Sequence, residues 1–114
     1  KIIVINEHLG GKKMYIGRYY INKNNPIAAV PRFQTVLMEY PQSNQIPEAL
    51  YRLIESFMMM GMRDEAIKYG SILGHNFPDS DWYQYGYELL ASDNIPNPSK
   101  GKMTAQVGKI QKAR

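Results

Sequence analysis

The chain has 114 residues, no cysteine and a formal net charge of +4. This length suffices for one domain with a modest core, and the lack of cysteine excludes disulfides, thiolate metal ligands and a cysteine nucleophile. Residues 95–114 carry five bases and no acid, whereas residues 1–94 carry nine bases and ten acids. Because a nucleic-acid-binding protein normally spreads positive charge over a folded face, this distribution argues against that class.

No segment reaches the roughly 18 to 20 consecutive apolar residues that span a bilayer. No apolar segment of the signal-peptide type follows a basic start either. The chain begins at Lys1 rather than at a methionine. We therefore expect it to be part of a longer protein whose targeting signal lies upstream.

An internal repeat organises the first four fifths of the chain. A shift of 37 positions, for example from Ile16 to Leu53, aligns residues of the same type at six apolar or punctuating positions. Such a period is typical of helical-repeat proteins. The six aligned pairs are Ile16 with Leu53, Tyr20 with Phe57, Ala29 with Ala66, Val36 with Leu73, Tyr40 with Phe77, and Pro41 with Pro78.

Each unit is predicted to form two amphipathic helices, because its apolar residues recur at the three- and four-residue spacing of a helical face. In the first unit the helices meet at Asn24–Asn25–Pro26, where an asparagine cap precedes a proline at the first helical position. In the second unit, Asn44 is predicted to cap a helix with Pro47 in its first turn, and Gly61 ends that helix.

The partner helix of the second unit is predicted to begin at Arg63–Asp64–Glu65. A last helix follows Pro78, with Asp79 or Ser80 as its cap, and runs to about Asp93. The small residues Ala29 and Ala66 are expected where the two helices of a pair cross at the usual 8–10 Å.

These elements predict an all-α fold of about five helices, in which tetratricopeptide-type helical hairpins stack as a fragment of an α-solenoid. The expected domain spans residues 1–94, with repeats at about 8–41 and 45–78 and a capping helix at 79–93. Residues 95–114 form a basic tail.

Three segments, in this order, resemble the BamD family of outer-membrane lipoproteins, also called ComL. They are Met14–Tyr15–Ile16–Gly17–Arg18–Tyr19–Tyr20, Pro47–Glu48–Ala49–Leu50–Tyr51–Arg52–Leu53, and Leu73–Gly74–His75–Asn76–Phe77–Pro78 followed by Ser80–Asp81–Trp82–Tyr83. The resemblance covers roughly residues 1–93 and implies the C-terminal repeats of the family, with no counterpart for the tail.

The resemblance implies a function in assembly. Members of the family are anchored by a lipid at the periplasmic face of the Gram-negative outer membrane. They bind the periplasmic domains of the barrel protein BamA, in a complex with further subunits that inserts β-barrel proteins into that membrane. The C-terminal repeats dock on BamA, and the arginine at the position of Arg32 is a docking residue.

Pro31 departs from a regular repeat. It lies inside the second helix of the first unit, where a proline removes one backbone hydrogen bond and crowds the carbonyl of Ile27. We expect a kink or an unpaired carbonyl there, which would shift the direction of Arg32.

The candidate partner-binding residues are two arginines, two methionines and a tryptophan. A guanidinium can offer a planar pair of donors to a carboxylate, thioethers suit adaptable surfaces, and tryptophan is frequent at interface hot spots. For each of them the alternative is an ordinary surface or core residue of the repeat. The residues are Arg18, Arg32, Met59, Met62 and Trp82.

No catalytic, cofactor or metal site is predicted. His75 lies near a helix end without a nucleophile and an acid beside it in the sequence, and the acids at Asp64–Glu65 are explained by helix capping. Gly10–Gly11 lacks the context of a phosphate-binding loop. The chain is therefore not expected to be an enzyme.

Two other functions remain open from the residues alone. A generic tetratricopeptide adaptor would clamp an extended peptide with lysine and asparagine in its groove, but the corresponding positions hold Met14, Arg18, Tyr51 and Glu55. The chain would otherwise be an accessory domain of a larger enzyme with its chemistry upstream.

In the tail, Met103, Val107 and Ile110 fall at i, i+4 and i+7 with lysines elsewhere. This is the pattern of a basic amphipathic helix, which can bind anionic lipid or an acidic partner. The alternative is a disordered, solvated tail.

Overall fold

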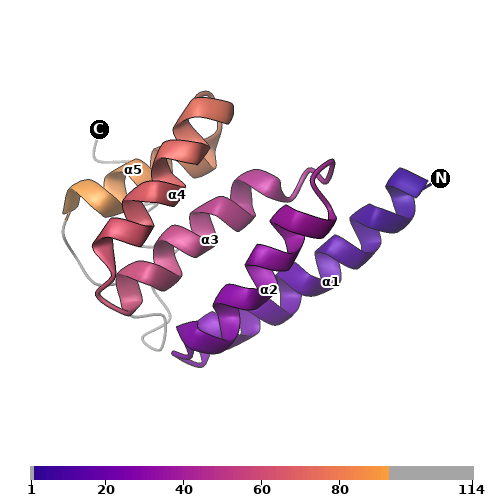
Figure 1. Ribbon diagram of the computed structural model, residues 1–114, viewed down its shortest axis with the longest axis horizontal. Helices are drawn as coiled ribbons and strands as arrows, with labels where there is room; N and C mark the ends of the chain where they lie inside the picture. Colours follow the sequence, from indigo (N-terminus) through magenta and orange to yellow (C-terminus); the bar gives the residue numbers. More distant parts are fainter. Residues whose placement is uncertain (1, 93–114) are drawn as a thin grey trace.

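The computed structural model describes residues 2–92, and they form five helices packed one after another as antiparallel hairpins (Figure 1). This confirms the all-α class and the number of helices. The basic tail lies outside the described residues. The helices are α1 (Ile2–Asn22), α2 (Pro26–Glu39), α3 (Ile46–Met59), α4 (Arg63–Asn76) and α5 (Asp81–Ser92).

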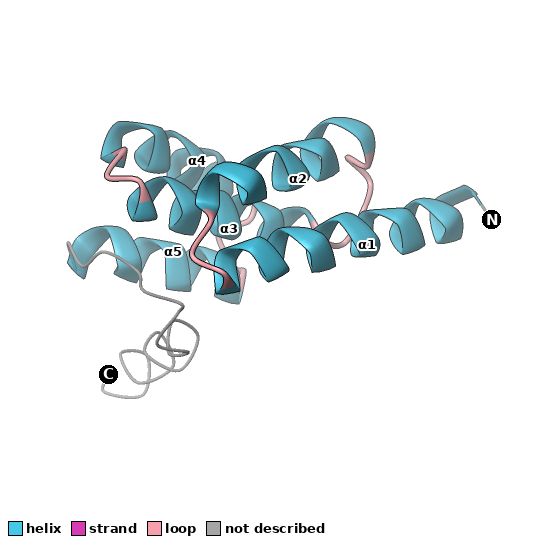
Figure 2. Ribbon diagram, turned by 90° about the horizontal axis from the view of Figure 1, so that it is seen from below, coloured by secondary structure: helices cyan, strands magenta, loops and turns pink. Residues whose placement is uncertain are grey.

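The helices are layered around α3. Figure 2 shows α2 and α4 on one side of the molecule and α1 and α5 on the other, with α3 between them. Ten of the 14 residues of α3 are buried, and α3 contacts all four other helices. In the part of the chain that the structure describes, no helix is long and apolar enough to cross a membrane.

Most of the predicted helix boundaries are confirmed. Asn25 caps α2: its side chain accepts a hydrogen bond from the backbone N–H of Ala28 at 3.3 Å. Gly61 ends the second hairpin's first helix with a φ of +72°, a conformation that glycine adopts without a steric penalty. At the start of α5, the hydroxyl of Ser80 accepts from the N–H of Trp82 at 3.0 Å, so Ser80 rather than Asp79 is the capping residue.

The predicted cap of α3 is wrong. The N-cap residue is Gln45, not Asn44, and the Gln45 side chain makes no capping bond. Ser43 closes this turn instead, because its buried hydroxyl accepts the N–H of Gln45 at 2.9 Å. Pro47 has no N–H, so one of the donors that a cap would satisfy does not exist in this first turn.

The core confirms the role of the small residues at the helix crossings. Ala29 and Ala66 are both fully buried, as predicted from the repeat. Phe57 is also in the core, and its ring stacks on Tyr69 of α4 with centroids 5.7 Å apart. Of the matched positions, Ala29 with Ala66 and Val36 with Leu73 are fully buried in both units, whereas the two prolines are exposed.

At a second pair of matched positions, the large residue and the glycine are on opposite helices in the two units. In the first hairpin the ring of the fully buried Phe33 lies against Gly17, where an added Cβ would be 2.5 Å from Phe33 Cε1. The 37-residue shift places Ile54 on Gly17 and Gly70 on Phe33. In the second hairpin the large residue is therefore on the first helix and the glycine on the second. Each hairpin interface therefore pairs one large residue with one glycine. The glycine is on the first helix in the first hairpin and on the second helix in the second hairpin.

Helix α2 continues through Pro31 to Glu39, and the hydroxyl of Thr35 donates to the Pro31 carbonyl at 2.8 Å. A proline here still leaves the carbonyl of Ile27 without its usual N–H partner. The kink that would shift Arg32 stays a prediction.

The Gly17–Phe33 contact is tested by replacing Gly17 with alanine. We expect Gly17→Ala to destabilise the fold by roughly 1–3 kcal/mol, because the methyl group overpacks a buried ring. The matched control is Gly11→Ala on the same helix, where the nearest atom to an added Cβ is 3.8 Å away. That substitution should stabilise the fold by up to about 1 kcal/mol through helix propensity. Urea unfolding measures both, and equal effects would contradict the close packing.

Candidate protein-docking site

Three charged residues of α3 lie on one face of the helix. Glu48, Arg52 and Glu55 are spaced at i, i+4 and i+7, which places them one above another. Arg52 Nε lies 3.2 Å from Glu48 Oε2, and Arg52 Nη1 lies 2.9 Å from Glu55 Oε1. The Arg52 side chain is only 11% exposed, so this arginine is held between two carboxylates largely away from solvent.

The same carboxylate reaches α1. Arg18 Nη1 lies 3.1 Å from Glu48 Oε2, and its side chain remains 36% exposed. Arg18, Glu48, Arg52 and Glu55 together form what we call the α3 charge network. Arg18 thus points away from the core of its own hairpin, as expected, but it contacts the next hairpin.

The network also reaches α5 through an aromatic cluster. The guanidinium of Arg52 lies 5.5 Å from the ring centroid of Trp82 and 5.4 Å from that of Tyr51, which are distances of cation–π contacts. Tyr51 and Trp82 are themselves in contact, with centroids 5.4 Å apart. The structure therefore joins two of the predicted docking residues, Arg18 and Trp82, through α3.

Sequence reasoning did not single out Glu48 and Arg52. The signal was present, because opposite charges at i and i+4 within an otherwise apolar helix indicate a paired, partly buried site. The burial of both partners, however, depends on α1 and α5, which are separated from α3 in the sequence.

Glu55 is the most deeply buried member of the network. It is fully buried, and among the described residues its Oε2 has no hydrogen-bond partner. Burial raises the pKa of the Glu55 carboxyl above its ordinary value, although Arg52 offsets part of the effect. Burial, followed by the charge of Glu55, likewise raises the pKa of Tyr51 well above 10.0.

The burial of α3 bears on the peptide-clamping alternative. Of the four positions compared with such a groove, Met14, Tyr51 and Glu55 are at most 2% exposed, and only Arg18 is accessible. Side chains that are buried in the fold do not clamp the end of a peptide. The generic adaptor is disfavoured.

Arg32 has a different environment on α2. Its guanidinium carbon lies 5.6 Å from the ring centroid of Tyr20, and its side chain is half-buried. In the part of the chain that the structure describes, Arg32 makes no ion pair or hydrogen bond to another side chain. A cation–π contact uses the face of the guanidinium, so its N–H donors remain available at the edge.

The methionines divide between core and surface. Met58 is buried, and Met59 is half-buried and packs against the core. Met62, the residue before α4, is 45% exposed. The structure thus leaves Met62 as an accessible thioether, separate from the α3 charge network.

The remaining polar candidates agree with their structural interpretation. His75 lies in the last turn of α4, and Asp64 and Glu65 lie in its first turn, where the helix dipole favours each charge. Across residues 2–92, the structure shows no group of three potential metal ligands.

Fold and site define a helical-repeat protein with accessible cationic and thioether side chains. The sequence profile of YfiO, described as an outer membrane lipoprotein, matches residues 1–72. The chain belongs to this family, the BamD/YfiO outer membrane lipoproteins, as the resemblance of its motifs predicted.

Two relatives carry the same name. The chain is 53% identical over 90 residues to the outer membrane protein assembly factor BamD of Rickettsia prowazekii, covering 79% of this chain and 36% of that protein. It is 40% identical over 99 residues to the BamD of Caulobacter vibrioides, covering 87% of this chain and 32% of that protein. The chain thus spans about a third of the length of these relatives.

No solved structure matches the chain. The printed name of the relatives is that of an assembly factor rather than an enzyme, in agreement with the prediction that the chain has no catalytic role.

Glu55→Gln tests the buried carboxyl through the pH dependence of stability. A carboxyl whose pKa is raised by folding binds more protons in the folded state, so its contribution is largest below its unfolded pKa of about 4.3 and is lost as pH rises through the folded pKa. Because glutamine does not titrate, the stability of the wild type relative to Glu55→Gln should fall as pH rises from about 4, and then level off.

Urea unfolding between pH 4 and pH 8 measures this difference. Glu39→Gln, at the exposed end of α2, reports the effect of losing a surface charge. A wild-type advantage that grows with rising pH would show that the environment of Glu55 favours its charged form.

Proposed function

We propose that this chain docks on the periplasmic domains of BamA, within the machinery that inserts β-barrel proteins into the outer membrane. The protein would be held at the periplasmic face of that membrane by an upstream lipid anchor. Family membership supports the proposal, as does the printed role of the relatives in outer membrane protein assembly. Other subunits of the assembly complex are further partners.

Arg32 is the residue that we expect to dominate docking. Its position over Tyr20 fixes the plane of the guanidinium without using its N–H donors. A planar cation held in this way can bind a partner carboxylate through two parallel hydrogen bonds, with little further loss of side-chain freedom.

Arg18 and Trp82 are expected to contribute less directly. Arg18 already shares Glu48 with Arg52, so a partner acid would have to compete with an existing ion pair. Trp82 packs against Tyr51 and offers only part of its ring. Both residues help to hold α1, α3 and α5 in one arrangement. Met59 and Met62 would add adaptable apolar contact at the turn between α3 and α4.

The enzyme-accessory alternative has no observation in its favour. Among residues 2–92, the groups whose pKa departs from its ordinary value are Tyr51, Arg52 and Glu55 of the buried cluster. Burial together with ion pairing accounts for these pKa shifts.

Substitutions at Arg32 test the docking site. Arg32→Ala should weaken binding to BamA periplasmic domains by on the order of 2–5 kcal/mol if the arginine is paired and desolvated in the complex. Arg32→Lys should lose much of the same affinity, because an ammonium group cannot form the two parallel bonds. Isothermal titration calorimetry gives the affinities, with thermal melts as the folding control.

The matched control is Lys68→Ala on α4, which also removes one positive charge. The Lys68 side chain is 65% exposed, and among the described residues its one ion pair is with Glu65 on its own helix. Its removal should leave the affinity nearly unchanged. If Arg32→Ala and Lys68→Ala bind as tightly as the wild type, Arg32 is a solvated surface residue and not part of the docking site.

A further inference from the structure

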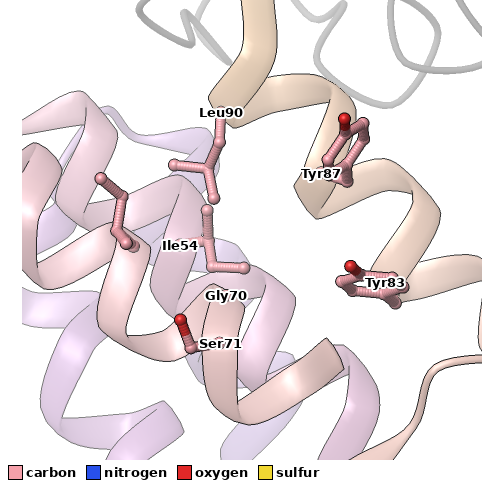
Figure 3. A pocket seen from close by; sticks show the side chains of 7 residues that line it. Ile54, Gly70, Ser71, Tyr83, Tyr87 and Leu90 are labelled. Atoms are coloured by element: carbon pink, nitrogen blue, oxygen red, sulfur yellow. The ribbon is translucent and has the colours of Figure 1, made fainter. Parts of the chain in front are cut away.

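A groove runs between α4 and α5, on the opposite side of α4 from α2. It contains a pocket of about 190 Å³, whose walls are mostly apolar (Figure 3). Gly70 lets the Leu90 side chain of α5 approach α4 closely, because an added Cβ at this position would lie 2.9 Å from Leu90 Cδ1. The lining residues are Ile54, Ile67, Gly70, Ser71, Tyr83, Tyr87 and Leu90.

The rim of this groove exposes apolar surface. Ile67 on α4 is 43% exposed and Tyr87 on α5 is 56% exposed. In the repeat, α1 is covered by α2 and α3 by α4, but within residues 2–92 no helix follows α5 to cover it. Exposed apolar surface around a groove is typical of a binding site.

Charge distinguishes this half of the molecule from the rest. Residues 63–92 carry five acids and two bases, hence −3, whereas residues 9–62 carry three acids and six bases, hence +3. Residues 95–114 carry five bases and no acid, hence +5. The tail is therefore complementary in charge to the helices that form the groove.

The tail also has the apolar pattern and the reach that the groove requires. Met103, Val107 and Ile110 have the spacing with which an amphipathic helix anchors in a groove. The tail continues from Ser92, two residues after Leu90 of the groove wall. The eleven residues from Ser92 to Met103 can extend over about 35 Å, which exceeds the roughly 18 Å length of the 12-residue α5.

We propose that residues 103–110 of this chain dock as a helix in the groove between α4 and α5. Their apolar face covers Ile67, Tyr87 and Leu90, and the net charge of the tail is opposite to that of residues 63–92. The tail then gives α5 the covering helix that α1 and α3 already have.

A second copy of the chain is a poorer occupant. Two copies meeting through this groove would bring two surfaces of like charge together, which opposes association. The family profile ends at residue 72, so it covers the α4 wall of the groove but not the α5 wall, which Tyr83, Tyr87 and Leu90 form.

The absence of native cysteine allows a clean cross-linking test. In the full chain, Ser71→Cys with Val107→Cys places one thiol in the groove and one on the apolar face of the tail. The control pair is Met38→Cys with Val107→Cys, since Met38 is 80% exposed on α2, away from the groove. Each pair is equilibrated in a glutathione redox buffer, and the intramolecular disulfide is quantified by mass spectrometry.

Docking should raise the effective concentration of the two thiols at least about tenfold for the groove pair over the control pair, which reports a freely moving tail. Adding Lys109→Glu and Lys112→Glu should lower the effective concentration of the groove pair relative to the control pair. The acidic tail would then be repelled by the negative net charge of residues 63–92. Equal effective concentrations for both pairs would overturn the proposal, as would disulfides formed mainly between molecules. Circular dichroism shows that each variant keeps its helices.

Discussion

The arrangement of this chain depends on the burial of one helix that carries charge. Helix α3 is enclosed by its four neighbours, yet its buried face includes Arg52 and Glu55 as well as apolar side chains. Removing a charged group from water costs several kcal/mol for each ion, and only a closely paired opposite charge offsets this desolvation cost. The position of α3 is therefore tied to the geometry of its ion pairs. Because Arg18 and Trp82 contact the same residues, α1 and α5 are tied to it as well.

This constraint separates two surfaces. The α3 charge network and its aromatic neighbours are largely enclosed, so they give the repeat its order rather than an open groove. Arg32 lies outside the network on α2, with its donors available, and the apolar groove lies between α4 and α5. One surface is suited to a carboxylate on another protein, and the other to an amphipathic segment of basic character.

The repeat pattern predicted the fold well, because matched residues such as Ala29 and Ala66 report the crossing of two helices directly. It missed the reversal of Gly17–Phe33 into Ile54–Gly70, since a search for like residues does not detect an interface whose large and small partners change sides. The cap at Asn44 was wrong because Ser43 forms the turn one residue earlier. For the site, the sequence predicted Arg18, Arg32, Met59, Met62 and Trp82 as candidates, which stays a prediction. It did not single out Glu48 or Arg52, because their contacts depend on helices far apart in the chain.

Hydrogen–deuterium exchange of the full chain, with and without BamA periplasmic domains, tests the central claim most directly. In the free chain, the amides of α3 should exchange most slowly, since that helix is enclosed on all sides. Adding the BamA domains should slow exchange in α2 around Arg32 and leave α4 largely unchanged. If protection appears only in α4 and α5 while α2 is unaffected, the docking surface lies elsewhere and the assignment of Arg32 is wrong.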